Sequence, residues 1–245
     1  MRFVVLAAVV LAAVIGAFLL DPIPQDPAYH LFADERALLG VPNFWNVATN
    51  LPFLVAGATG WLQYGRLASP RLAAHYRVFC TGVVLVAFGS AWYHLAPSDA
   101  SLVWDRLPMT IAFMAFFAAL IADRIHWVAG RALLWPLVVA GFVSIAWWAR
   151  TEAAGAGDLR AYGLVQFLPI LLAPLILWFW RDGSLSGRHL GLAFIAYVIA
   201  KLAEHFDAAI FAATGFGGHA IKHLFAALAA WWILRSFQGA PARAL

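Results

Sequence analysis

The sequence predicts an all-α integral membrane protein with a seven-helix transmembrane core and one extra helix at the N-terminus. Three observations support this prediction: an apolar composition, eight long apolar stretches and an uneven distribution of arginines between the loops. Hydrophobic residues make up 64% of the 245 residues and charged residues only 11%, against about 25% in a typical soluble domain. So few charges cannot cover a soluble protein of this size, which excludes a soluble enzyme and a disordered chain. The single cysteine, Cys80, excludes a secreted disulfide scaffold.

Eight stretches are apolar enough to cross a bilayer, which takes ~20 helical residues. Their apolar runs are continuous, which favours helices over the short alternating strands of a transmembrane barrel. The expected spans are residues 3–20, 44–64, 77–95, 107–122, 132–149, 161–180, 189–210 and 219–237. Several of them carry an internal proline or glycine, which bundled membrane helices tolerate. These residues are Pro52, Gly57, Pro136, Pro169 and Pro174.

The first stretch resembles a signal peptide in its Arg2 and the apolar run that follows. The run is long, however, and ends in Leu20-Asp21-Pro22 without a small-x-small cleavage site, so we favour an uncleaved helix. We therefore divide the chain into an N-terminal transmembrane helix or signal anchor, 1–22, and a seven-helix membrane domain, 23–245. The loop 21–43 between the first two spans is the longest non-helical stretch, and loops of that length often carry function.

The arginines orient the helices, because positive residues concentrate in cytoplasmic loops. With Met1 in the cytoplasm, ten arginines fall inside and four outside. The inside set is Arg2, Arg66, Arg71, Arg77, Arg124, Arg131, Arg181, Arg188, Arg235 and Arg243, and the outside set is Arg36, Arg106, Arg150 and Arg160. We therefore expect both termini to be cytoplasmic. The compact chain with short loops leads us to expect that the membrane is a bacterial inner membrane. We interpret the net charge of +4 as these basic loops rather than a nucleic-acid surface.

Five polar residues are expected at one depth, near the extracytoplasmic face. Ser90 and His94 are four residues apart at the outer end of the span 77–95, so they share a helix face. Asp105 stands just before the span 107–122, and His219 and His223 open the last span, again on one face. Polar residues at membrane depth are expensive and usually functional, so their shared level is informative.

These residue types suit a metal centre. Two histidines at i and i+4 can point at one ion, and a third completes a three-nitrogen site with an open position for water, the layout of catalytic zinc. Asp105 would then accept a proton from the water or orient it, and Ser90 would hydrogen-bond a developing oxyanion. Each residue taken alone has a simpler interpretation: a hydrogen-bonded histidine, a packing serine or a helix-start acid.

The five residues in this order and spacing resemble the metal signature of the alkaline ceramidase family, within the membrane hydrolase superfamily that includes adiponectin-receptor-like proteins. The segment Asn43–Phe53 is similar to that family's entry into its first core helix, and the resemblance spans roughly residues 29–236. It implies seven core helices and an intramembrane zinc amidase. The implied metal ligands are His94, His219 and His223, and the implied catalytic residues are Asp105 and Ser90.

One departure concerns calcium. The eukaryotic ceramidases carry a calcium site built from an acidic N-terminal loop and a glutamate directly before Phe-Trp-Asn, and that glutamate is Asn43 here. Asp34 and Glu35 could still supply oxygen ligands to Ca²⁺. We favour a solvated loop at this position.

Further polar residues are candidates for support of the metal site. Lys201, Glu204 and Asp207 recur at i, i+3 and i+6, so we interpret them as an ion network. Glu204 and Asp207 are candidates to orient the metal ligands through hydrogen bonds. Lys222 lies between the two late histidines, and we expect it to face elsewhere and to pair with Glu204 or Asp207. Tyr162 is either an oxyanion donor or an ordinary interfacial aromatic residue.

The first functional hypothesis is a zinc-dependent amidohydrolase that cleaves a ceramide-like membrane lipid into a fatty acid and a sphingoid-type amine. The lipid would enter sideways from the bilayer. A second is a lipid esterase or phospholipase with the same zinc site. A third is a metal-stabilised membrane receptor without turnover. A transporter is disfavoured, because no pair of broken, symmetry-related helices and no charge relay crossing the membrane stands out.

Overall fold

The computed structural model describes residues 1–238, and within them it is all-helical, with no β-strand. Its helices are α1 (Arg2–Leu19), α2 (Phe44–Ala48), α3 (Leu51–Leu62), α4 (Ala73–Leu95), α5 (Asp99–Arg124), α6 (Trp127–Ala153), α7 (Arg160–Phe179), α8 (Gly187–His205), α9 (Asp207–Thr214) and α10 (Gly218–Phe237). Arg243, assigned above to the cytoplasmic side, and the end of the domain 23–245 lie outside the described residues.

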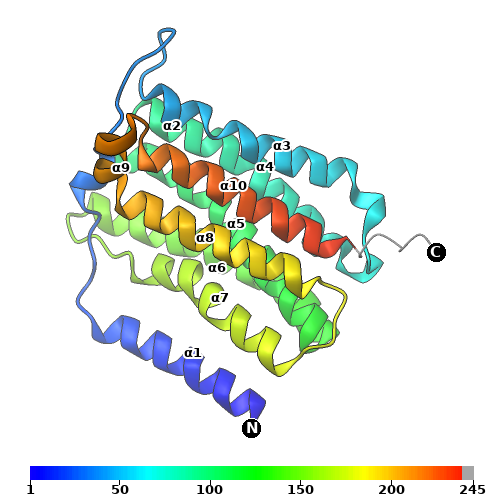
Figure 1. Cartoon of the computed structure of the whole chain (residues 1–245). Coiled ribbons are helices and arrows are strands. Elements are labelled where there is room, and N and C mark those ends of the chain that lie inside the picture. The colour runs from blue at the N-terminus through cyan, green and yellow to red at the C-terminus, as the bar shows by residue number, and fades with distance from the viewer. Residues whose placement is uncertain (239–245) are drawn as a thin grey trace.

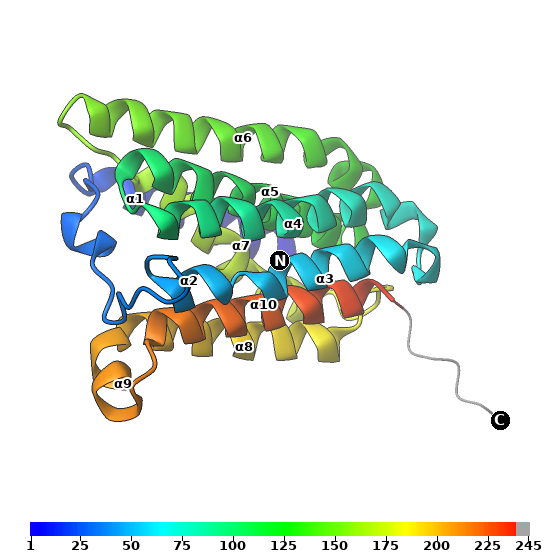
Figure 2. The same ribbon diagram turned by 90° about the horizontal axis from the view of Figure 1, so that it is seen from above.

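The long helices run side by side along one direction, and α1 stands at the edge of the bundle against α7 (Figures 1 and 2). No residue of α1 is buried. The loop that follows α1 runs to one end of the bundle. This end, called here the α9 end, also carries α2, α9, the C-terminus of α4 and the N-terminus of α10 (Figure 1). The topology thus gathers segments that are distant in sequence at one level.

Five helices are long and apolar enough to cross a membrane. They span Arg2–Leu19, Pro70–Leu95, Asp99–Arg124, Trp127–Ala153 and Arg160–Phe179. α3, α8 and α10 are not among them: α3 is short, α8 carries Arg188, Lys201 and Glu204, and the polar residues of α10 lower its mean hydropathy. The structure therefore supports several membrane-spanning helices, consistent with a multi-pass membrane protein.

Two expected spans, 44–64 and 189–210, are each broken in two. The first divides between α2 and α3, where Pro52 starts a new helix and the Asn50 side chain donates to the carbonyl of Asn46 (2.7 Å). The second divides at Phe206, between α8 and α9. There the Asp207 carboxylate accepts from the backbone N–H of Ala33 and of His219, both at 2.9 Å, which fixes a turn in place of a continuous helix. Apolar periodicity alone does not reveal either break.

Small residues let α4 and α5 approach closely, as is common in helix bundles of membrane proteins. At Gly89 a methyl group would collide with the backbone carbonyl of Trp104. Glycine at this position therefore brings the C-terminal part of α4 onto the first turns of α5. The neighbouring residues, Ser90 on α4 and Asp105 on α5, are brought close by the same contact.

Candidate metal centre

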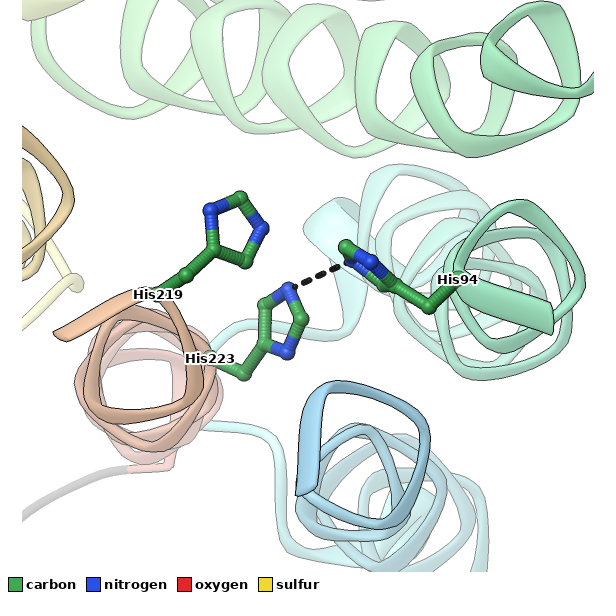
Figure 3. Close-up of side chains that lie close together, drawn as sticks. All are labelled: His94, His219 and His223. Atoms are coloured by element: carbon green, nitrogen blue, oxygen red, sulfur yellow. Dashed lines mark hydrogen bonds between the residues drawn. The ribbon is translucent and has the colours of Figure 1, made fainter. Parts of the chain in front are cut away.

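The structure brings His94, His219 and His223 together in the interior (Figure 3). One ring nitrogen from each lies within 4.8 Å of the other two. The three ring centroids are 4.8 to 4.9 Å apart, and the side chains are between 1% and 5% exposed. Within the described residues these histidines are the one such group of three metal-capable side chains.

Local structure explains how the two elements present these rings. His219 and His223 are one turn apart on α10, and the backbone of α10 is anchored where Asp207 accepts from the His219 N–H (2.9 Å). His94 lies at the C-terminus of α4, and its carbonyl accepts from the side-chain amide of Asn43 (2.9 Å). The last carbonyls of a helix lack hydrogen-bond partners within it, and the Asn43 amide supplies a donor to one of these carbonyls of α4.

The nitrogens of the cluster fit a bound cation. Nε2 of His94 and Nε2 of His223 face each other at 3.2 Å, so both lone pairs can point to one place. The Thr49 hydroxyl lies 3.0 Å from Nδ1 of His223, which leaves Nε2 for the cluster. Such a contact to the remote ring nitrogen is typical of metal-binding histidines, because it fixes the tautomer and the ring orientation. The cluster therefore has the donor atoms and the spacing to hold a metal ion.

Ser90 and Asp105 line the same cavity as His223. Both are buried, at 2% and 6% exposure. Together with His223 and Lys222 they form the polar end of one internal cavity. A carboxylate and a hydroxyl next to three imidazoles supply a proton acceptor and a hydrogen-bond donor at the same place.

The cavity has a volume of about 350 Å³, in the range of small-molecule sites, and is otherwise lined by apolar residues. Along α10 its lining reaches from Lys222 to Ile233, a distance of roughly 16 Å at 1.5 Å per residue. Its long sides come from α4, α5, α7, α8 and α10. Within the described chain α8 packs along α10 but not closely along α7, so the cavity lies where two neighbouring helices are poorly packed.

Lys222 corrects one expectation. It was expected to face away from the histidines, but its Nζ lies 3.4 Å from Nε2 of His219, and it lines the cavity. The expected pairing with Glu204 is found, at 2.6 Å. Glu204 also pairs with Lys201 and accepts from the Tyr29 hydroxyl (3.3 Å).

Asp207 and Tyr162, the other two candidates for support of the metal site, differ in position. Asp207 supports the site through the backbone of His219, as described above. Tyr162 packs in an apolar cluster with Tyr93 and Trp148, and its ring lies 5.0 Å from the Arg106 guanidinium. No contact between Tyr162 and the three histidines is found among the described residues.

The loop carboxylates are arranged differently from a calcium site. Both oxygens of Asp34 accept from the Arg36 guanidinium, at 2.7 and 2.6 Å, and this guanidinium lowers the pKa of Asp34. Glu35 is exposed. Asn43 directs its amide N–H₂ towards the His94 carbonyl rather than offering an oxygen. The residues present do not fit a Ca²⁺ site. Asp34 is buried in its ion pair with Arg36, whereas the favoured interpretation of the loop expected it to be solvated.

Two contributions were missed by the sequence reasoning. The Phe32 ring lies 4.7 Å from the rings of both His94 and His219, so the loop covers the cluster. His30, which was given no role, bridges the Tyr93 hydroxyl (3.0 Å) and Asp99 (3.1 Å) and ties this loop to the ends of α4 and α5. A loop packing on distant helices leaves no spacing pattern in the sequence.

Comparison with known proteins gives one family. A family model described as Ceramidase matches residues 40–180, more than half of the chain. The matched part includes Ser90, His94 and Asp105 and ends before α8 and α10. No curated protein matches the chain.

Proposed function

The chain belongs to the ceramidase family, and from this membership we propose that it is an intramembrane zinc-dependent amidohydrolase acting on ceramide-like lipids. The products would be a fatty acid and a sphingoid-type amine. The observation that carries the proposal is the buried trio His94, His219 and His223 at the polar end of an otherwise apolar cavity. A metal-capable cluster beside a space for an acyl chain is the arrangement that hydrolysis of a membrane lipid needs.

The proposal includes a membrane architecture. We place seven core helices of the domain 23–245 in the bilayer. They are α2 and α3 counted together as one, α4 to α7, α8 and α10, and α1 is an additional span. Glu204 pairs with both Lys201 and Lys222, which lowers the cost of placing these charged residues of α8 and α10 in the bilayer. From the arginine distribution we infer that the α9 end is extracytoplasmic and that both termini are cytoplasmic. The compact chain with short loops supports a bacterial inner membrane as the location.

His94, His219 and His223 are the proposed zinc ligands. When bound by three imidazoles, Zn²⁺ keeps an open position, lowers the pKa of water to about 7 and polarises a carbonyl group. Thr49 orients His223 through Nδ1, and Asp207 anchors the backbone of His219. Phe32 and its loop cover the histidines, which limits the access of bulk water from that side.

The remaining steps belong to side chains of the chain itself. The acyl chain enters the cavity from the bilayer between α7 and α8. The amide then lies at the polar end of the cavity. A water oxygen bonds to the carbonyl carbon while the carbon–nitrogen bond breaks. Asp105 takes one proton of that water and delivers it to the leaving nitrogen, and Ser90 donates a hydrogen bond to the carbonyl oxygen.

The test is a lipid panel with purified protein in detergent, analysed by mass spectrometry. We expect release of fatty acid from N-acyl sphingoid lipids, loss of release in Asp105→Asn, and little release from O-acyl lipids. Preference for O-acyl lipids would make the chain an esterase or phospholipase. Protein that binds metal, unfolds on chelation and cleaves no lipid would be a metal-stabilised receptor, and the proposal would be wrong.

A further inference from the structure

Lys222 is a half-buried cation that the chemistry described so far does not use. It lies on α10 between the two late histidines, and its side chain is 16% exposed. The Glu204 carboxylate at 2.6 Å holds it as an ammonium group. A charge at the end of an apolar cavity, largely shielded from solvent, is costly, so its presence calls for a reason beyond packing.

The geometry leaves donor capacity on this ammonium. A lysine Nζ has three N–H donors. Within the described residues one is taken by Glu204 at 2.6 Å and one faces Nε2 of His219 at 3.4 Å. The latter nitrogen cannot accept from Lys222 while it binds a cation, so at most one donor is satisfied when the cluster is filled. The others are available to a group in the cavity.

The charges around the cavity favour an anion beside Lys222. Lys222 shares the polar end of the lining with Asp105, Ser90 and His223, and it is the one cation among the described lining residues. Its partner Glu204 is also paired with Lys201, so two ammonium groups share this carboxylate. Asp105 is the one carboxylate among the same described lining residues, and it becomes neutral when it takes the proton of the water, which leaves Lys222 to face the developing anion. Hydrogen bonds from a charged donor in a dry site are stronger than neutral ones.

We propose that Lys222 binds the anionic oxygen on the acyl carbon: the oxyanion that develops at the carbonyl during hydrolysis and the carboxylate of the fatty acid product. This inference rests on the proposed function for the oxyanion, whereas binding of the carboxylate is open to test without turnover. Lys222 is then a catalytic residue, and Ser90 is a second, neutral donor to the same oxygen.

The competing explanation is that Lys222 only neutralises Glu204. Lys201 offers a matched control, because it pairs with the same carboxylate but is 40% exposed and lies outside the cavity lining. If neutralisation were the whole role, Lys222→Met and Lys201→Met would have similar effects. In both variants the other lysine remains to pair with Glu204.

The experiment is native mass spectrometry of the full-length protein in detergent with an equimolar mixture of myristate and myristyl alcohol. We expect wild type to prefer myristate about tenfold or more, as a hydrogen bond to a charged donor implies. Lys222→Met keeps the alcohol but loses the preference, Lys222→Arg keeps part of it, and Lys201→Met behaves as wild type. A preference that survives in Lys222→Met, or is absent from wild type, overturns the inference.

Kinetics supply the second readout. Lys222→Met should lower kcat about 100-fold with a smaller change in KM and with unchanged metal content, whereas a structural role would lower only the folded fraction. If wild type prefers myristate through Lys222 but hydrolyses no N-acyl lipid, the proposed function fails and the binding site stands. If hydrolysis occurs and Lys222→Met retains kcat, the inference fails and the proposed function stands.

Discussion

Gly89→Ala tests whether the close contact of α4 with α5 positions the site. The added methyl group would meet the carbonyl oxygen of Trp104, a backbone atom that cannot rotate away. One of the two helices must therefore shift, and overpacking of this kind costs about 1–3 kcal/mol of stability. Ser90 and Asp105 are the next residues on the two helices, so the shift also changes their relative position. A displacement of ~1 Å at catalytic groups lowers the rate about 100-fold.

Two further glycines give matched controls. Gly163 on α7 has no neighbour within 4 Å, so Gly163→Ala should be neutral or stabilising by up to about 1 kcal/mol, because alanine favours a helix. Gly130 on α6 packs against the backbone of Ala122 on α5, so Gly130→Ala overpacks the bundle away from the site.

The assay is thermal unfolding in detergent together with lipid hydrolysis per folded molecule. We expect lower unfolding temperatures for Gly89→Ala and Gly130→Ala, and loss of rate per folded molecule for Gly89→Ala alone. Equal rates in these two variants would refute the reasoning that this contact positions Ser90 and Asp105.

Three other predictions follow from the contacts described. Thr49→Val removes the hydroxyl that contacts Nδ1 of His223, so metal affinity should fall about 10- to 100-fold in a competition titration with a chelator. Unchanged affinity would show that Thr49 does not orient His223 for metal binding. Because Arg36 occupies both oxygens of Asp34, a calcium-selective chelator should leave hydrolysis unchanged while a zinc chelator abolishes it; calcium-dependent activity would contradict this account of the loop. The pKa of Asp34 is lowered from 3.8 in the folded protein, so its contribution to stability is present above pH ~4 and is lost as the pH falls through the folded value. Unfolding temperatures of wild type and Asp34→Asn should therefore differ at pH 7 and converge in acid, and a constant difference would be inconsistent with this pairing.

The sequence was sufficient for the residues that share one helix face. His219 and His223 at i and i+4, with His94 at a helix end of the same depth, come together as spacing and topology predict. The same rule was misapplied to Lys222, since residues at i and i+3 also share a face and Lys222 stands three positions after His219.

Contacts between elements distant in sequence were beyond the sequence reasoning. The helix breaks at Asn50 and Phe206 depend on side-chain hydrogen bonds, and Asp207 acts through two backbone groups from remote segments. Phe32 covers the histidines from a loop whose sequence has no periodicity. The apolar pattern predicts which segments are helical but not which side chains a turn brings together.

The most direct test of the central claim is the metal content of purified wild type and of the single variants His94→Ala, His219→Ala and His223→Ala, with folding checked by circular dichroism. We predict about one zinc ion per folded wild-type chain, as a three-imidazole site requires, and loss of zinc in each variant. A folded variant that keeps its full zinc content, or wild type without any zinc, would contradict the account.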